Sequence, residues 1–170
     1  MHRTDISADQ EQFRQWLLQE AEENGNAVVE VAGDEHGAPY AFTVGAWRRF
    51  GVAEAVVVGL PDGMGSALVN AYVELARGGR RFDPGGCYED FFEDLPVTLE
   101  RVAKGHYPEY FGSAFLLYRT GDFPAVQLIV PTSEGAWPWQ PDAPPGFAEW
   151  QPVLTDSGLP ESWTPGVDGP

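Results

Sequence analysis

His106 lies in the segment GHYPEYFG, residues 105–112, where tyrosines and one carboxylate surround the imidazole. An imidazole among phenol and carboxylate groups could transfer protons as a general acid or base, or contact a ligand in a pH-dependent way. The catalytic candidates are therefore His106, Tyr107 and Glu109. The structural alternative is a histidine near a helix start that satisfies a backbone group.

A second set of candidates points to binding. Tyr40 and Thr43 place a polar group on each face of one expected strand, and Tyr110 follows close behind His106. We predict Tyr40, Thr43 and Tyr110 as ligand contacts. A tyrosine half-buried on a sheet is also common in protein cores, which is the alternative for Tyr40.

Trp137 and Trp139 bracket a proline in SEGAWPWQP, residues 133–141. The proline forces the residue before it into an extended conformation, so the segment can cover a sheet or a helix. Two interpretations remain open. Both rings pack onto the body as a clasp, or they line a groove with one ring exposed to a peptide or flat ligand.

Motifs for metals and cofactors are missing. The three histidines stand far apart, the one cysteine, Cys87, stands alone, and no pair has the spacing of metal ligands. Neither a phosphate-binding glycine loop nor a G-x-S-x-G elbow occurs. A Cys87–His106 pair has no third partner that the sequence identifies. We expect no metal and no cofactor.

The formal charge is −16, from 26 acidic and 10 basic residues. Such a charge repels phosphate backbones, so we expect no nucleic-acid binding, and it suits a basic protein partner. Arg48–Arg49 and Arg80–Arg81 are the two dense basic spots. They could meet an anion or an acidic partner, or they could be solvated surface.

The start of the chain, MHRTDISADQEQF, is polar, and the longest apolar runs are too short to cross a bilayer. One cysteine fits a reducing compartment. We therefore expect a cytoplasmic protein with no membrane contact.

The candidates need a scaffold, and the hydrophobic pattern predicts one. Ser7 and Gln10 form a capping box before a helix over about residues 8–24, whose aromatic face packs on the body, and Gly25 ends it. A second helix opens at Pro61-Asp62-Gly63 with Asp62 as N-cap and Met64, Leu68, Tyr72 and Leu75 in one row; it ends at Gly78–Gly79. Apolar residues of HYPEYFGSAFLLYR, residues 106–119, have helical spacing. Strands are predicted over 27–33, 39–47, 53–61, 95–103 and 123–132.

From residue 131 onward the composition changes, since nine of the fifteen prolines and four of the six tryptophans lie there. Proline removes backbone donors, so this part should be an extended tail wrapped over the body. The prediction is an α+β fold: a single mostly antiparallel sheet with packed helices and this tail. Residues 1–154 form one domain, and residues 155–170 are an extended or partly disordered extension.

Several segments, taken in order, resemble a bacterial family known as domain of unknown function 4262. PYAFTVGAW precedes AVVVGLP and a helix with a Leu-Val-Asn step; Tyr110-Phe111-Gly112, AVQLIVPTSEGAWPWQP and QPVL follow. The resemblance covers about residues 27–154. The family has a His-Pro-Glu triplet where this chain has Val52-Ala53-Glu54, so any role of that histidine cannot operate here. The resemblance implies fold boundaries and no particular activity.

Two function classes follow from these observations. The first is an acidic, cytoplasmic, non-catalytic binding protein that recognises a basic protein partner, as immunity proteins do, or a small ligand. The layout is similar to immunity-type and Suppressor-of-fused-like domains, which bind proteins. The alternative is a small enzyme that acts on a small molecule at a site around His106, Tyr107, Glu109 and Tyr40.

Overall fold

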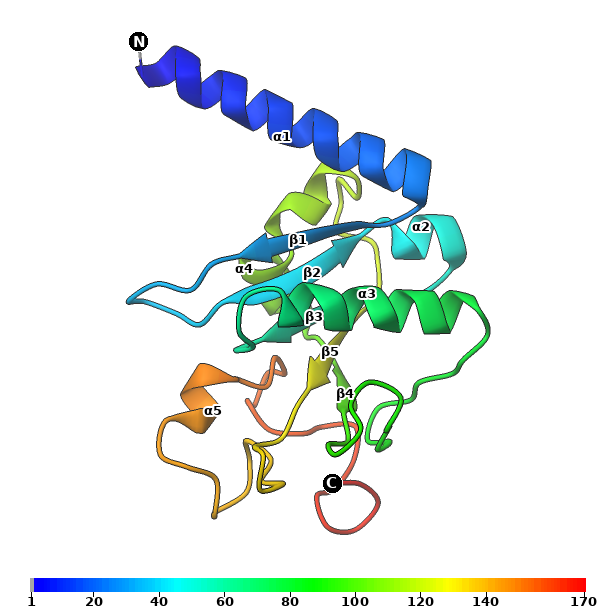
Figure 1. Ribbon diagram of the computed structural model, residues 1–170, viewed down its shortest axis with the longest axis vertical. Helices are drawn as coiled ribbons and strands as arrows, with labels where there is room; N and C mark the ends of the chain where they lie inside the picture. The colour runs from blue at the N-terminus through cyan, green and yellow to red at the C-terminus, as the bar shows by residue number, and fades with distance from the viewer. Residues whose placement is uncertain (1) are drawn as a thin grey trace.

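The computed structural model describes the backbone of residues 2–170 and the side chains of residues 8–170. A five-stranded sheet in the order β1-β2-β3-β5-β4 forms the centre of this part (Figure 1). Only β3 and β5 pair in parallel; the other neighbours are antiparallel, which confirms the α+β class with a mostly antiparallel sheet. The strands are β1 (Ala27–Val31), β2 (Tyr40–Val44), β3 (Glu54–Val58), β4 (Thr98–Arg101) and β5 (Ala125–Ile129).

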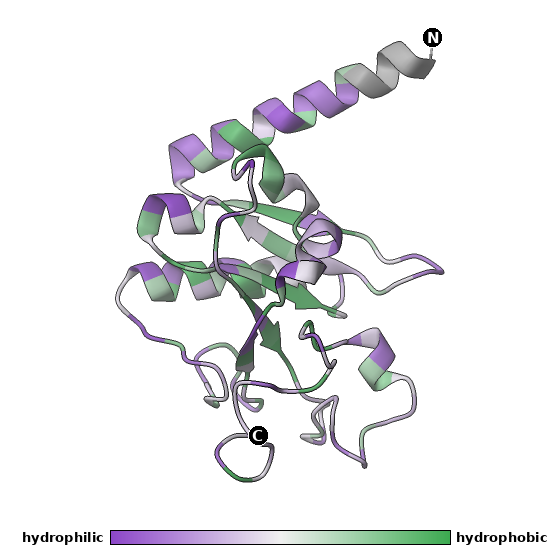
Figure 2. Cartoon of the chain, turned by 180° about the vertical axis from the view of Figure 1, so that it is seen from behind, coloured by the Kyte–Doolittle hydropathy of each residue, from purple (hydrophilic) through white to green (hydrophobic). Residues whose placement is uncertain are grey.

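The predicted hairpin is β1–β2, with Ala27 opposite Val44 and Val31 opposite Tyr40. The strand β3 is buried at every residue, as its continuous apolar run predicted. It is covered on both faces because helices lie in front of the sheet and behind it (Figure 1). The strands are the hydrophobic part of the fold, whereas α1 (His2–Asn24) carries many hydrophilic residues (Figure 2).

The helix α3 (Met64–Arg77) covers one face of the sheet. Its buried row is Leu68, Val69, Tyr72 and Val73, which packs on the alanines and valines of β2 and β3. Met64 and Leu75, expected in that row, are largely exposed. The predicted Asp62 N-cap is wrong: the N-cap is Gly63, in the left-handed conformation, without a side-chain cap.

The opposite face is covered by α1, η1 (Lys104–His106), α4 (Tyr107–Tyr110) and η2 (Gly112–Leu116). Gly25 ends α1 with a φ of 78°, as predicted, but the helix begins at His2 and not at a Ser7 cap. The expected aromatic packing of α1 is wrong as well. Leu17 and Ala21 are buried, whereas Phe13 and Trp16 are 39% and 43% exposed.

Two segments differ locally from the prediction. The strand expected over 39–47 ends at Val44, and α2 (Ala46–Phe50) follows Gly45, whose φ is 110°. The helical segment expected within residues 106–119 is split at Phe111, where the backbone leaves the helical region. At Gly45 and at Phe111 the chain thus changes direction, and the residues that follow each of them contribute to the site described below.

The tail is folded onto the β4–β5 side of the sheet (Figure 1). Its one helix is α5 (Phe147–Trp150). Trp137, Leu154 and Trp163 are buried, so apolar burial fixes the tail along most of its length.

Buried polar side chains hold the tail as well. On β5, Gln127 donates to the carbonyl of Pro152 at 2.7 Å and accepts from the amide of Leu154 at 2.8 Å. On β4, the Glu100 carboxylate accepts from the amides of Glu161 and Ser162 at 2.7 and 2.9 Å. Residues 155–170 are therefore attached to the sheet, although they contain no helix or strand.

Candidate functional site

The structure places His106 beneath the tail. Its Nε2 lies 3.0 Å from the carbonyl oxygen of Thr155, and the side chain is half-buried. The neighbouring Tyr107 is buried; its hydroxyl donates to the carbonyl of Phe123 at 2.8 Å, and burial raises the pKa of Tyr107 to about 12. Both rings thus satisfy backbone carbonyls, which corresponds to the structural alternative for this histidine.

The other predicted residues of this region come together beside it. The hydroxyl of Tyr40 donates to the backbone carbonyl of Glu109 at 3.1 Å, and the Tyr40 ring meets Tyr110 edge-on at 5.1 Å. Tyr110 is 6.4 Å from the ring of His106. Burial raises the pKa of both tyrosines. The rings of Tyr40, Tyr110 and His106 therefore form one aromatic cluster. None of these three residues lines either of the two cavities described below.

Thr43, the remaining candidate on β2, is fully buried and belongs to a centre that the sequence did not predict. Its hydroxyl donates to the Glu54 carboxylate at 2.7 Å and accepts from the amide of Ala55 at 2.9 Å. Glu54, at the start of β3, has no exposed surface. The hydroxyl of Tyr118 also donates to this carboxylate, at 2.5 Å.

Backbone amides complete the Glu54 centre, which consists of Thr43, Glu54, Tyr118 and the first amides of α2. Gly45, Ala46 and Trp47 donate to the carboxylate at 2.9, 3.3 and 3.1 Å. A buried carboxylate is tolerated when donors surround it and when helix amides point at it. Glu54 therefore anchors β2, α2 and the 112–118 segment to one another.

The electrostatics follow from burial. Burial raises the pKa of the Glu54 carboxyl, and hydrogen bonds from Tyr118, Thr43 and the amides of Trp47 and Gly45 act in the opposite direction. Burial and the nearby charge of Glu54 raise the pKa of the Tyr118 phenol. Tyr118 is therefore a hydrogen-bond donor to Glu54, and its oxygen accepts from the amide of Arg48 at 3.1 Å.

A cavity of about 350 Å³ adjoins the Glu54 centre, where α1, α2 and the end of η2 meet. We call it the arginine pocket. Its lining residues include two arginines and three apolar residues: Leu18, Ala21, Glu22, Gly45, Arg48, Arg49 and Leu117.

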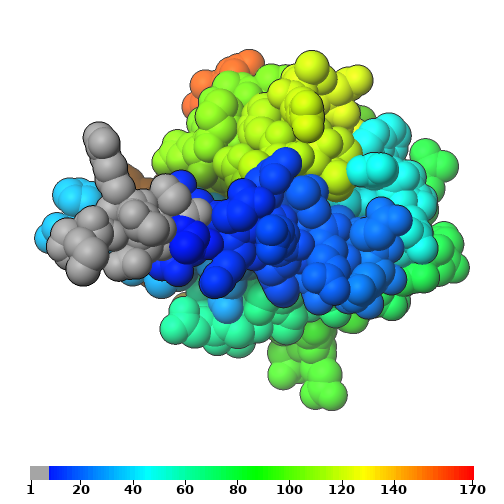
Figure 3. Space-filling model, turned by 90° about the horizontal axis from the view of Figure 1, so that it is seen from above, coloured from blue at the N-terminus to red at the C-terminus, as the bar shows by residue number. Residues whose placement is uncertain are grey.

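A second cavity, the α1–η2 groove, has a volume of about 650 Å³. Figure 3 shows α1 bordering the 110–120 segment along one side. Phe13 and Leu116 supply apolar surface, and Asp9, Glu11 and Arg14 are the charged residues of the lining. Trp16 contacts Phe13, with ring centroids 5.8 Å apart, and extends the apolar surface along α1.

Of the two tryptophans of SEGAWPWQP, Trp137 is buried as the clasp interpretation predicts, whereas Trp139 is half-buried and also lines a cavity of about 350 Å³ at the end of the tail. Trp137 is 6% exposed and packs on Ile129 and Val153. Trp139 stacks on Trp137 with ring centroids 5.5 Å apart, and its indole nitrogen donates to the carbonyl of Pro170 at 2.9 Å. The pair connects the sheet to the end of the tail.

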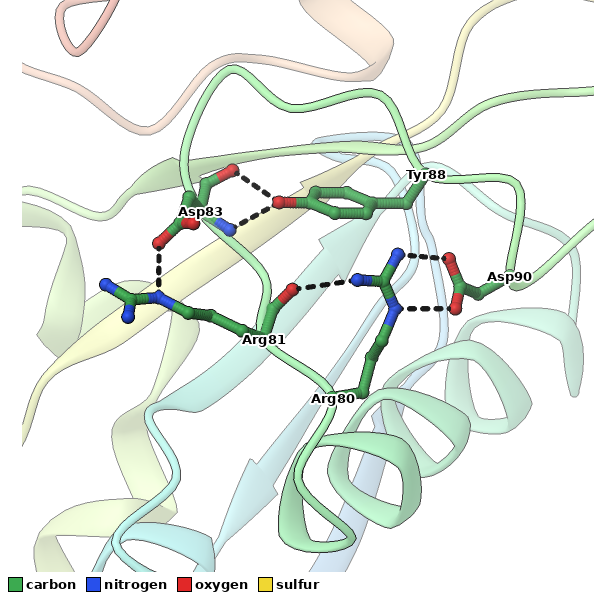
Figure 4. Close-up of polar contacts among 5 residues, drawn as sticks. All are labelled: Arg80, Arg81, Asp83, Tyr88 and Asp90. Atoms are coloured by element: carbon green, nitrogen blue, oxygen red, sulfur yellow. Dashed lines mark hydrogen bonds and ion pairs between the residues drawn. The ribbon is translucent and has the colours of Figure 1, made fainter.

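The basic spot Arg80–Arg81 lies in the loop after α3, and both guanidinium groups contact carboxylates of the same loop (Figure 4). The guanidinium of Arg80 makes two hydrogen bonds to the Asp90 carboxylate, at 2.9 and 3.0 Å, and lies 5.0 Å from the Tyr88 ring. Arg81 contacts Asp83 at 3.3 Å. The nearby guanidinium of Arg80 lowers the pKa of Asp90.

Asp90→Asn should therefore destabilise the protein in a pH-dependent way. Because the folded-state pKa of Asp90 is lowered, its contribution is present above the usual aspartate pKa and is lost as the pH falls through the lowered value. We expect a Tm about 2 °C lower at neutral pH, with the difference shrinking below about pH 4. Thermal melts of both proteins across this range are the measurement. Asp94→Asn, in the same exposed loop, is the control, and an equal effect of the two substitutions would contradict the prediction.

Within the described residues, no three His, Cys, Asp or Glu side chains come together in a way that could hold a metal ion. In the same part of the chain, no helix combines the length and apolarity needed to cross a membrane.

Fold and site together define a small α+β domain in which segments distant in sequence meet at a buried carboxylate. A family model described as a domain of unknown function (DUF4262) matches residues 20–144, and the chain therefore belongs to this family. The match confirms the resemblance noted from the sequence. Thr43 and Gly45 lie in a segment that carries the resemblance, and both donate hydrogen bonds to Glu54, within the matched residues. No curated protein and no solved structure gave a significant match.

Proposed function

We propose that the chain is a non-catalytic binding protein of the bacterial cytoplasm that recognises a basic protein partner, as immunity proteins do. The observation that carries this proposal is the α1–η2 groove together with the exposed aromatic pair beside it. Phe13 and Trp16 expose 39% and 43% of their surface. Large aromatic side chains that stay exposed next to a concave surface are frequent anchors of protein interfaces.

Charge identifies the chemistry of the partner. Over residues 8–24, α1 carries Asp9, Glu11, Glu20, Glu22 and Glu23 against the single cation Arg14, and the whole chain has a formal charge of −16. A partner with lysines or arginines around an apolar anchor complements this surface and is attracted to it at long range. A second copy of the chain would bring like charge to the same surface, which disfavours self-association.

A displayed library of random peptides tests the proposal, because selection from such a library reveals the preferred chemistry of the partner directly. The library is selected on the wild-type protein and, in parallel, on the double variant Phe13→Ser, Trp16→Ser. We expect the wild type to enrich peptides with basic residues and an aromatic or aliphatic anchor, and the double variant to bind them at least ~10-fold more weakly, since hot-spot aromatics contribute about 2 kcal/mol or more.

Trp150→Ser is the matched control, because Trp150 is an equally exposed tryptophan (48%) far from α1 in the sequence. It should leave peptide binding unchanged. Peptides without basic residues, or equal binding by the double variant, would exclude this groove as the recognition surface. Dimerisation through α1, measured by analytical ultracentrifugation, would contradict the proposal by showing that the groove binds a second copy of the chain.

A further inference from the structure

The two arginines of α2 carry charge that no contacting carboxylate of the described chain neutralises. Arg14, Arg77, Arg80 and Arg81 each lie within 3.5 Å of an Asp or Glu oxygen. Among residues 8–170, no carboxylate oxygen comes within 4.0 Å of the guanidinium of Arg48 or Arg49. In a chain with 26 acidic and 10 basic residues, two adjacent arginines without an acidic contact form a local excess of positive charge.

Both arginines line the same cavity, and hydrogen bonds hold the side chain of Arg49 and the backbone of Arg48. Arg49 donates from Nη1 to the backbone carbonyl of Glu22 at 3.1 Å, which holds its guanidinium between α1 and α2. The amide of Arg48 donates to the hydroxyl of Tyr118, which is itself bound to Glu54. The backbone that carries the two guanidinium groups is therefore held before any ligand arrives, which reduces the entropy lost on binding.

The first amides of α2 are not available to a ligand. Those of Gly45, Ala46 and Trp47 already donate to Glu54. An anion in the arginine pocket would thus be bound by guanidinium groups, whose planar fork matches a carboxylate in a two-point contact.

The rest of the pocket defines the body of the ligand. Leu18, Ala21 and Leu117 are the apolar residues that line the cavity together with the arginines, and its volume of about 350 Å³ suits a small organic molecule. Glu22 also lines the pocket, and the chain as a whole is acidic. Both features disfavour a doubly charged anion such as inorganic phosphate and leave a single negative charge as the better match.

We propose that the arginine pocket binds an organic monocarboxylate, with the carboxylate on Arg48 and Arg49 and the apolar body against Leu18, Ala21 and Leu117. This site does not depend on the proposed protein-binding function, because it uses the C-terminal half of α1 and different side chains.

Three probes separate the chemical possibilities: benzoate, its neutral isostere benzamide, and inorganic phosphate. Each is titrated up to about 10 mM into ¹⁵N-labelled protein, a range that detects weak binding of small ligands. We expect benzoate to shift the backbone signals of Ala21, Gly45, Arg48 and Leu117 in a saturable way. Benzamide and phosphate should bind at least ~10-fold more weakly, since benzamide has no negative charge and phosphate has no apolar body.

The double variant Arg48→Gln, Arg49→Gln should weaken benzoate binding by at least ~10-fold. Both side chains are exposed, so the variant should remain folded, which its amide spectrum verifies directly. Arg81→Gln, at an arginine outside the pocket lining that contacts Asp83, is the control and should leave binding unchanged. No saturable shift with benzoate, equal binding by the double variant, or tighter binding of phosphate would each overturn the proposal.

Discussion

Truncation of the chain after Thr132 is expected to leave a protein that does not fold at room temperature. The deletion removes Trp137, Leu154 and Trp163, which are buried in the full chain. It also leaves the buried groups of Glu100 and Gln127 without the tail atoms that they bind. Each large apolar side chain contributes about 2–3 kcal/mol on burial and each orphaned polar group costs about 1–3, so the sum is comparable with the 5–15 kcal/mol of a typical domain.

Single tryptophan substitutions test the same idea in a protein that still folds. Trp137→Ala should lower the free energy of unfolding by about 3–5 kcal/mol, as expected for a buried tryptophan. Trp150→Ala is the matched control in the same tail. Trp150 is 48% exposed and its indole nitrogen donates to the carbonyl of Gly59, so a loss of about 1 kcal/mol is expected.

Urea titrations followed by circular dichroism measure both variants and the truncation. An unchanged urea midpoint in the truncated protein would show that the tail is not part of the folded unit. Equal losses for Trp137→Ala and Trp150→Ala would contradict the clasp, because the loss of stability would then not depend on how deeply each tryptophan is buried.

The elements that the sequence predicted well are those with a strong local pattern. The run from Ala55 to Pro61 is apolar throughout, and a strand buried on both faces is the element that such a run specifies. The β1–β2 hairpin and the end of α1 at Gly25 rest on equally local signals, namely alternation and a glycine with positive φ.

The elements that it missed depend on distant contacts. The helix α2 has five residues, too few for a periodic pattern, and it follows a strand without a polar cap because Glu54 accepts its first amides. The exposed faces of Phe13 and Trp16 were missed for a related reason. Their spacing is that of a packed helix, and only the position of α1 relative to η2 decides which aromatic rings find a partner.

The candidate site also combines residues that a local pattern reveals with residues that only distant contacts bring together. Tyr40, Tyr110 and His106 stand out in the sequence through their chemical types, and the structure brings their rings together. Glu54 stands out only as the residue left from a family triplet. Its donors include Tyr118, 64 residues away, and backbone amides, which carry no side-chain signal. Sequence spacing cannot identify such a centre.

Glu54→Ala is expected to lower the free energy of unfolding by about 3–5 kcal/mol, the range found when one partner of a buried charged network is removed. The substitution leaves two hydroxyls and three amides of a fully buried centre without an acceptor. Glu54→Gln should cost less, about 2 kcal/mol, since it keeps one acceptor oxygen. Glu35→Ala, at a glutamate whose side chain is 84% exposed, is the control and should change stability by less than about 0.5 kcal/mol.

A double-mutant cycle with Tyr118→Phe separates loss of the network from general damage to the core. Alone, Tyr118→Phe should cost about 1–2 kcal/mol, because it removes one donor to Glu54 and the acceptor of the Arg48 amide. If Glu54 and Tyr118 act as one unit, the double variant should be more stable than the sum of the single losses predicts, by about 1 kcal/mol or more. Additive losses would mean that the two side chains stabilise the fold independently. Hydrogen exchange supplies the local readout: the amides of Gly45 and Trp47 should lose protection in Glu54→Ala, since the carboxylate is the acceptor that both of them use.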